Sequence, residues 1–86
     1  MHNLVYLYTL ENCEACKKAS MTLSKMGHKV QKISIDNPIL EIGVKMLFKD
    51  GLIHAPLVVI PNEGIYMFGE DMNLLRIVSL KEDNNG

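Results

Sequence analysis

The sequence lacks several features that would assign it to a common class. Its 86 residues hold only two cysteines, too few for the disulfide framework of a small secreted domain. No apolar run approaches the roughly 20 residues of a membrane span, and no basic N-terminal segment with a small-residue cleavage site marks a signal peptide. These absences predict a single domain, residues 1–86, that works in the reducing cytoplasm without a membrane partner.

Strong charge of either sign is also missing. Nine Lys and Arg residues stand against ten Asp and Glu residues, for a formal net charge of −1, and the basic residues form no run. Because nucleic acid requires a basic patch, we expect no nucleic-acid partner. The chain is 48% hydrophobic, which is too apolar for disorder, but it buries only about 60–65% of its unfolded surface. We therefore expect its chemistry to lie near the surface. We also expect a monomer.

Hydrophobic periodicity predicts alternating strands and helices. In chain order we expect a strand at Leu4–Thr9, a helix at 13–26, a strand at 30–35, a helix at 39–49, strands at 57–60 and 65–68, and a helix at 71–81. Gly27 is placed to end the first helix and Asp71 to cap the last one, while residues 82–86 are expected to fray. This β-α-β-α-β-β-α order predicts an α/β fold with a four-stranded mixed sheet flanked by helices.

The segment Cys13-Glu14-Ala15-Cys16 lies where the first predicted strand gives way to the first helix. Backbone N–H groups and the dipole at a helix N-terminus favour the thiolate of Cys13. Cys16 shares the apolar stripe of the helix with Ala19 and Leu23, so we expect it to face the core. The pair therefore predicts two roles: Cys13 attacks a disulfide, and Cys16 resolves the mixed disulfide that forms.

Other interpretations of the cysteine pair remain open. A closed zinc site needs four ligands, and the chain adds only His2, His28 and His54, without the usual His-x₃₋₅-His spacing. We therefore expect no metal site within one chain, and a metal or cluster held between two chains is the alternative from another class. Two inert core cysteines and a redox-silent adaptor are further alternatives. His54 itself is either a proton shuttle beside Cys13 or a solvated loop residue.

Four segments together resemble the glutaredoxins of the thioredoxin superfamily. They are the strand Leu4–Thr9, the Cys13-Glu14-Ala15-Cys16 helix start, Ala55-Pro56 at the start of a strand, and Gly69-Glu70-Asp71 at the start of the last helix. The resemblance covers about residues 4–80. It implies a thioredoxin-like fold and a cytoplasmic thiol-disulfide oxidoreductase that acts in electron transport and cell redox homeostasis. It also implies glutathione as co-substrate, no obligatory cofactor, and disulfide-bearing proteins as partners.

The resemblance also assigns substrate-binding residues. It implies a cis bond before Pro56, where the frequency of about 5–6% cis among X-Pro bonds alone predicts trans. It further implies that the backbone of Ala55 pairs with a bound cysteinyl peptide, and that Gly69, Glu70 and Asp71 hold the γ-glutamyl end of glutathione. A helix N-terminus at these three residues would supply N–H groups for a carboxylate.

The chain departs from the common glutaredoxin pattern beside each motif. It has Leu10 where Lys is common, Glu14-Ala15 between the cysteines, His54-Ala55 before the proline, and Phe68-Gly69 before the last motif's acids. Together, the absence of that Lys and the presence of Glu14 remove positive charge where the glycyl carboxylate of glutathione docks. Asp71-Met72 is similar to the glutaredoxin-like electron donors of ribonucleotide reductase. That similarity implies the alternative function, in which thioredoxin reductase recharges the protein.

Overall fold

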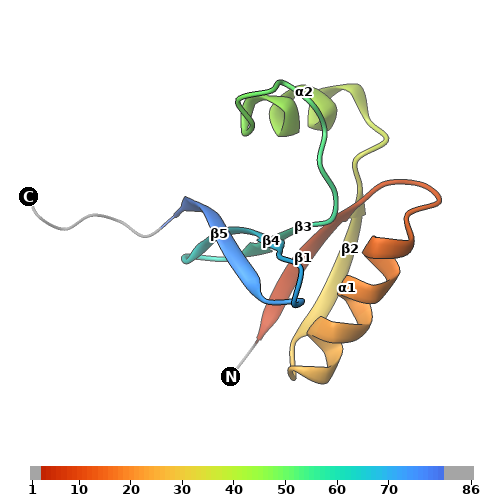
Figure 1. The fold of residues 1–86 in the computed structure, drawn as a ribbon, viewed down its shortest axis with the longest axis vertical. Coiled ribbons are helices and arrows are strands. Elements are labelled where there is room, and N and C mark those ends of the chain that lie inside the picture. Colours follow the sequence, from red (N-terminus) through yellow and green to blue (C-terminus); the bar gives the residue numbers. More distant parts are fainter. Residues whose placement is uncertain (1–2, 81–86) are drawn as a thin grey trace, which may run out of the picture.

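The computed structural model describes residues 3–80, which form a mixed β-sheet and two helices (Figure 1). The elements are β1 (Leu4–Thr9), α1 (Glu14–Lys25), β2 (Lys29–Ser34), α2 (Pro38–Met46), β3 (Leu57–Ile60), β4 (Gly64–Phe68) and β5 (Leu74–Ser79). The strand order is β2-β1-β3-β4-β5, in which β1 and β2 are parallel and the other neighbouring pairs are antiparallel. The predicted α/β class is confirmed, but the sheet has five strands and not four. Neither described helix is long and apolar enough to cross a membrane.

The first part of the chain forms the expected strand-helix-strand unit. After α1 the chain reverses at Gly27, whose φ is +91°, a conformation that glycine adopts without a Cβ clash. The N–H of His28 donates to the carbonyl of Leu23 at 3.1 Å, and that of Gly27 donates to Ser24 at 3.0 Å. The predicted glycine cap is therefore confirmed, and it returns the chain so that β2 runs parallel beside β1.

Each face of the sheet carries its own apolar cluster, because side chains alternate along a strand. The cluster under α1 consists of Val5, Leu7, Ala19, Leu23 and Val58. The cluster under α2 consists of Ile35, Val44 and Leu57. Leu57 and Val58 are neighbours on β3 and are 2% and 0% exposed, so β3 is covered on both faces. The two helices therefore pack on opposite faces of the sheet.

The second helix begins at Pro38, one residue before the predicted start, and ends three residues earlier than predicted. The Asn37 side chain accepts from the N–H groups of Ile39 at 2.9 Å and Leu40 at 3.4 Å, and Pro38 occupies the first turn, where its missing N–H is not needed. The helix ends at Met46, and the predicted extension to Lys49 is wrong. The N–H groups of Leu47 and Phe48 donate to Val44 and Lys45, three residues back, which closes the helix in a tighter turn.

The predicted hairpin is confirmed. β3 and β4 pair antiparallel, with Val58 opposite Tyr66 and Ile60 opposite Gly64. Asn62 turns the chain with a φ of +66°, and asparagine tolerates this left-handed region better than most residues. The connection is one residue shorter than predicted, because Gly64 already belongs to β4.

The last element is the main correction to the sequence analysis. The helix predicted at 71–81 is wrong, since residues 74–79 form β5 along β4. Residue 81 and the predicted frayed tail at 82–86 lie outside the described residues. The N–H of Gly69 donates to the carbonyl of Asn73 at 2.8 Å, and the N–H of Met72 donates to Gly69 at 3.0 Å. These bonds close a tight turn, in which Met72 has a φ of +57°, and Asp71 lies in that turn and caps no helix.

Candidate functional site

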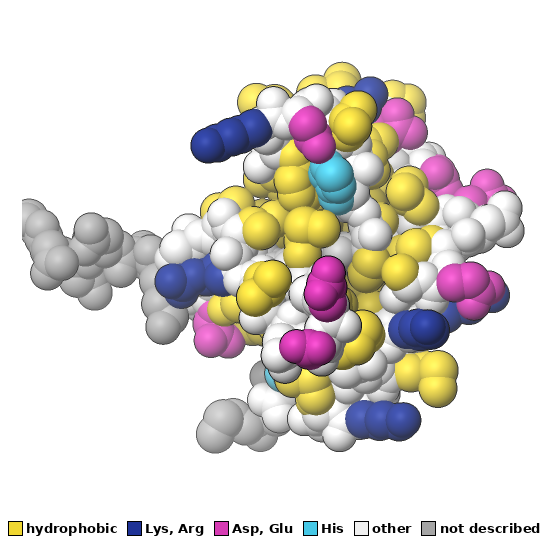
Figure 2. Space-filling view, viewed as in Figure 1, with side chains coloured by type: hydrophobic (Ala, Val, Ile, Leu, Met, Phe, Trp, Pro, Cys, Tyr) yellow, Lys and Arg dark blue, Asp and Glu magenta, His cyan; other side chains and the backbone are white. Residues whose placement is uncertain are grey.

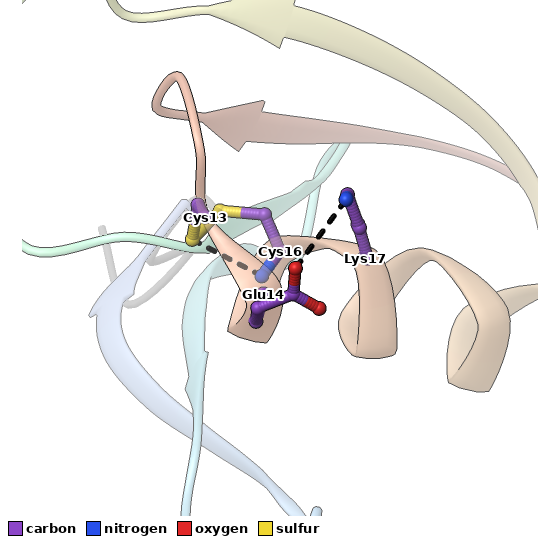
Figure 3. A network of polar contacts seen from close by, with 4 residues as sticks. All are labelled: Cys13, Glu14, Cys16 and Lys17. Carbon is purple, nitrogen blue, oxygen red and sulfur yellow. Dashed lines mark hydrogen bonds and ion pairs between the residues drawn. A yellow bond between two sulfur atoms is a disulfide. The ribbon is translucent and has the colours of Figure 1, made fainter.

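Cys13 and Cys16 form a disulfide at the N-terminus of α1, with their Cα atoms 5.2 Å apart (Figure 3). The chain leaves β1 at Thr9 and turns at Asn12, whose φ is +55°, so that Cys13 becomes the N-cap residue. The Sγ of Cys13 accepts from the backbone N–H of Cys16 at 3.1 Å. The predicted placement of the pair, at the junction of strand and helix, is therefore confirmed.

The two sulfur-bearing residues differ in exposure. Cys13 is half-buried, whereas Cys16 is 4% exposed and lies on the same buried stripe of α1 as Ala19 and Leu23. The expectation that Cys16 faces the core is confirmed. Once the disulfide is reduced, an N–H donor and the positive end of the helix dipole both face the Sγ of Cys13, and each stabilises negative charge on that atom.

A cavity of about 220 Å³ adjoins the start of α1. Its lining comes from α1, from the loop before β3, from the end of β4 and from the β4–β5 turn: Ala15, Lys18, Ala55, Pro56, Met67, Phe68, Gly69 and Met72. Three predicted binding residues, Ala55, Pro56 and Gly69, thus lie around one space beside the cysteine motif. Glu70 and Asp71 do not line the cavity, and both are exposed in the turn between Gly69 and Met72.

The peptide bond between Ala55 and Pro56 is cis. This is the conformation that the glutaredoxin resemblance implies, and it differs from the trans form that frequency alone predicts. Pro56 is buried beside the start of β3. The turn at 69–71, by contrast, presents no helix N-terminus, so the proposed binding of a carboxylate at those residues loses its helix-based argument and stands on the resemblance alone.

His54 lies in the loop before β3, where its side chain makes two contacts. Its Nε2 lies 2.8 Å from Oδ2 of Asp50, and its ring lies 4.3 Å from the ring of Phe48, centroid to centroid. The N–H of Leu52 donates to Asp50 at 3.0 Å, and this bond, followed by the contact with His54, lowers the pKa of the Asp50 carboxyl. Through these contacts, His54 links two parts of the loop that leads to Pro56. In the sequence, this role is indicated only by the four-residue spacing of Asp50 and His54.

The charges beside the disulfide are mixed and exposed. The Nζ of Lys17 lies 3.4 Å from Oε1 of Glu14, and the two side chains are 70% and 83% exposed. Such an exposed pair contributes little to stability. Lys18 lines the cavity, and Glu11 is exposed in the loop before Cys13. Sequence reasoning missed Lys18 and Phe68 as cavity residues because nothing local marks which turn of α1 faces the end of β4.

Two other cavities are larger. None of the three is lined by a cysteine, but only the 220 Å³ cavity is lined by a residue of the cysteine motif, Ala15. One, of about 270 Å³, separates α2 from the sheet and is lined almost entirely by apolar side chains of α2, β1 and β3. The other, of about 350 Å³, lies beside the β3–β4 turn and includes His28 and Glu63. Within residues 3–80, no three His, Cys, Asp or Glu side chains gather where they would hold a metal ion. The disulfide and its adjoining cavity are therefore the candidate site.

Comparison of this chain with known proteins gives no match among family models, curated proteins or solved structures.

Proposed function

We propose that the protein is a thiol-disulfide oxidoreductase of the glutaredoxin type, with a thioredoxin-like fold. The observation that carries the proposal is the Cys13–Cys16 disulfide at the N-terminus of α1, next to a cavity that Ala15 of the same motif and Pro56 line. A half-buried sulfur at the helix start and a buried one a single turn later suit a stepwise exchange. Of the two residues, Cys13 is the more accessible to a substrate.

In the proposed reaction, the reduced protein transfers two electrons to a substrate disulfide. The thiolate of Cys13 attacks one sulfur, so that a bond from Cys13 to the substrate forms, the substrate S–S bond breaks, and the first thiolate leaves and takes a proton. Cys16 then loses its proton and attacks the Sγ of Cys13, which releases the second substrate thiolate. The products are two substrate thiols and the Cys13–Cys16 disulfide.

Two molecules of glutathione would return the disulfide to the dithiol and leave as oxidised glutathione. The alternative is a glutaredoxin-like protein that thioredoxin reductase recharges and that donates electrons to ribonucleotide reductase. The β4–β5 turn supports the alternative, because it offers Glu70 and Asp71 on an exposed turn and no helix N-terminus for the γ-glutamyl carboxylate. The negative charge of Glu14, next to Cys13 in the sequence, likewise disfavours binding of the glycyl carboxylate of glutathione.

The test is NADPH-coupled reduction of the oxidised protein in two parallel assays. One contains glutathione with glutathione reductase, the other thioredoxin reductase, and Cys13→Ser is the control in both. Turnover in either assay that is lost in Cys13→Ser supports the oxidoreductase, and the assay that responds identifies the reductant. Absence of turnover in both assays, with a stoichiometric metal in protein purified without chelator, would replace the proposal with the metal-binding alternative.

A further inference from the structure

We propose that the dithiol site selects disulfides flanked by cationic groups and discriminates against anionic ones. This inference rests on the proposed function and deepens it. The site itself is the Cys13–Cys16 pair with its cavity. Its selectivity comes from the carboxylates around it, which we call the acidic rim: Glu11, Glu14, Glu70 and Asp71.

The acidic rim comes from two segments, one that carries Cys13 and one that borders the cavity beside the start of α1. Glu11 and Glu14 lie on the loop and first turn that carry Cys13. Glu70 and Asp71 lie between Gly69 and Met72 in the sequence. Gly69 and Met72 both line the cavity. All four acidic side chains belong to exposed residues. Figure 2 shows acidic side chains over the β4–β5 turn, next to hydrophobic surface. Groups beside a substrate disulfide that occupy this cavity would therefore lie near the segments that carry these carboxylates.

Two lysines offset the rim only in part. Lys18 lines the cavity, whereas Lys17 is already paired with Glu14 at 3.4 Å (Figure 3). Four carboxylates against two ammonium groups leave a local charge of −2, when the whole chain carries only −1. The rest of the cavity lining is uncharged and largely apolar. Among the charged residues of these two segments and the cavity lining, negative charge therefore predominates.

Exposed charges act mainly on the rate of encounter and are screened by salt. The screening length is about 30 Å at 0.01 M ionic strength and about 3 Å at 1 M, so a charge effect at this site must be large in dilute buffer and vanish in concentrated salt. The cationic groups can be Lys or Arg residues beside a protein disulfide, or the amines of a small-molecule disulfide. The experiment therefore uses peptide disulfides first and small-molecule disulfides second.

The experiment measures how fast the reduced protein is oxidised by three peptides that differ only beside their disulfide, where they carry Lys, Gln or Glu. Reduced protein is prepared with dithiothreitol and desalted, and its remaining thiols are counted by mass after acid quenching. Each rate constant is divided by that of mercaptoethanol with the same peptide, which removes intrinsic reactivity. We expect the Lys peptide to react about tenfold faster than the Glu peptide at 0.01 M salt, and about equally fast at 1 M. Cystamine against dithiodiglycolate should give the same order.

Matched variants locate the effect. Glu70→Gln with Asp71→Asn should bring the rates of the Lys and Glu peptides together at low salt. Glu41→Gln with Glu63→Gln removes the same charge from α2 and the β3–β4 turn, and should leave their ratio unchanged. Equal low-salt rates for the three peptides with the unmodified protein would overturn the acidic-rim proposal. Failure of even the Gln peptide to oxidise the dithiol would instead overturn the proposed oxidoreductase.

Discussion

At the scale of single residues, the difference in exposure between the two cysteines predicts that their serine variants react differently with a substrate disulfide. Cys16→Ser should still be attacked at Cys13 by a substrate disulfide but should be unable to release it, so a mixed disulfide accumulates. Cys13→Ser should form none, because its remaining thiol is the 4% exposed Cys16. Intact mass after incubation with a disulfide peptide measures both. A stable adduct on Cys13→Ser and none on Cys16→Ser would reverse the two roles.

Asp50 gives a second prediction at this scale. The N–H of Leu52, and then His54, lower the pKa of its carboxyl in the folded protein. A carboxyl whose pKa is lower in the folded than in the unfolded protein stabilises the fold at pH values above the unfolded-state pKa, which is about 3.9 for Asp. This contribution is lost as the pH falls through the folded-state pKa. The stability advantage of wild type over Asp50→Asn should therefore shrink between pH 5 and pH 2.

Urea unfolding across this pH range measures the effect. His54→Gln is the matched variant, because it keeps the larger contribution from Leu52 and should retain part of the pH dependence. A difference between wild type and Asp50→Asn that stays constant down to pH 2 would contradict the assigned cause.

At the scale of elements, the sequence predicted well wherever local signals and packing agree. Gly27 ends α1 as predicted, and Asn37 caps α2 within one residue of the predicted start, because caps act within one turn, whatever the rest of the fold does. The failure at 71–81 has a different cause. Leu74, Leu75 and Val78 fit a helical spacing, but the same segment is rich in residues that suit a strand, and the open edge of β4 offers it backbone partners. Only five residues separate the end of β4 from the start of β5, but β4 lies outside the 71–81 segment, so the spacing of apolar residues within that segment does not reveal the partner.

Alanine substitutions at two separate glycines, Gly64 and Gly43, test the position of β5. A Cβ at Gly64 would overlap the carbonyl oxygen of Val78 and lie 3.1 Å from the Cδ of Arg76, both on β5. Gly64→Ala should therefore destabilise the protein by about 1–3 kcal/mol. Gly43→Ala meets no atom within 4 Å and lies inside α2, so it should stabilise by about 0.5–1 kcal/mol.

Urea unfolding of both variants gives the two changes in free energy. Opposite signs are expected. If Gly64→Ala is as stable as wild type, then Val78 does not lie against Gly64, and the antiparallel pairing of β4 with β5 is wrong.

At the scale of the whole molecule, the sheet divides the core into two clusters that share no buried residue. The sequence predicted which residues are apolar, but their division between faces depends on strand order and register, which arise only when distant segments pair. The site shows the same limit. The cysteine motif is local and was predicted from the residues themselves. Ala55, Pro56 and Gly69 of the adjoining cavity were expected only from the resemblance, because they come together with α1 only in the folded chain.

This division predicts additive energetics. Leu23 belongs to the cluster under α1 and Ile35 to the cluster under α2, and each is 0% exposed. Leu23→Ala should cost about 2–5 kcal/mol and Ile35→Val about 0.5–1.5 kcal/mol. Because the buried clusters are separated by the sheet, the double variant should lose the sum of the two within about 0.5 kcal/mol. Urea unfolding of the four proteins in this cycle measures the coupling, and Met21→Ala, at a position 62% exposed on the same helix as Leu23, is the control for a surface truncation. A coupling well above 0.5 kcal/mol, by the same criterion, would mean that a cavity on one face shifts the strands enough to disturb the other, and the sheet would then behave as a deformable layer shared by one core.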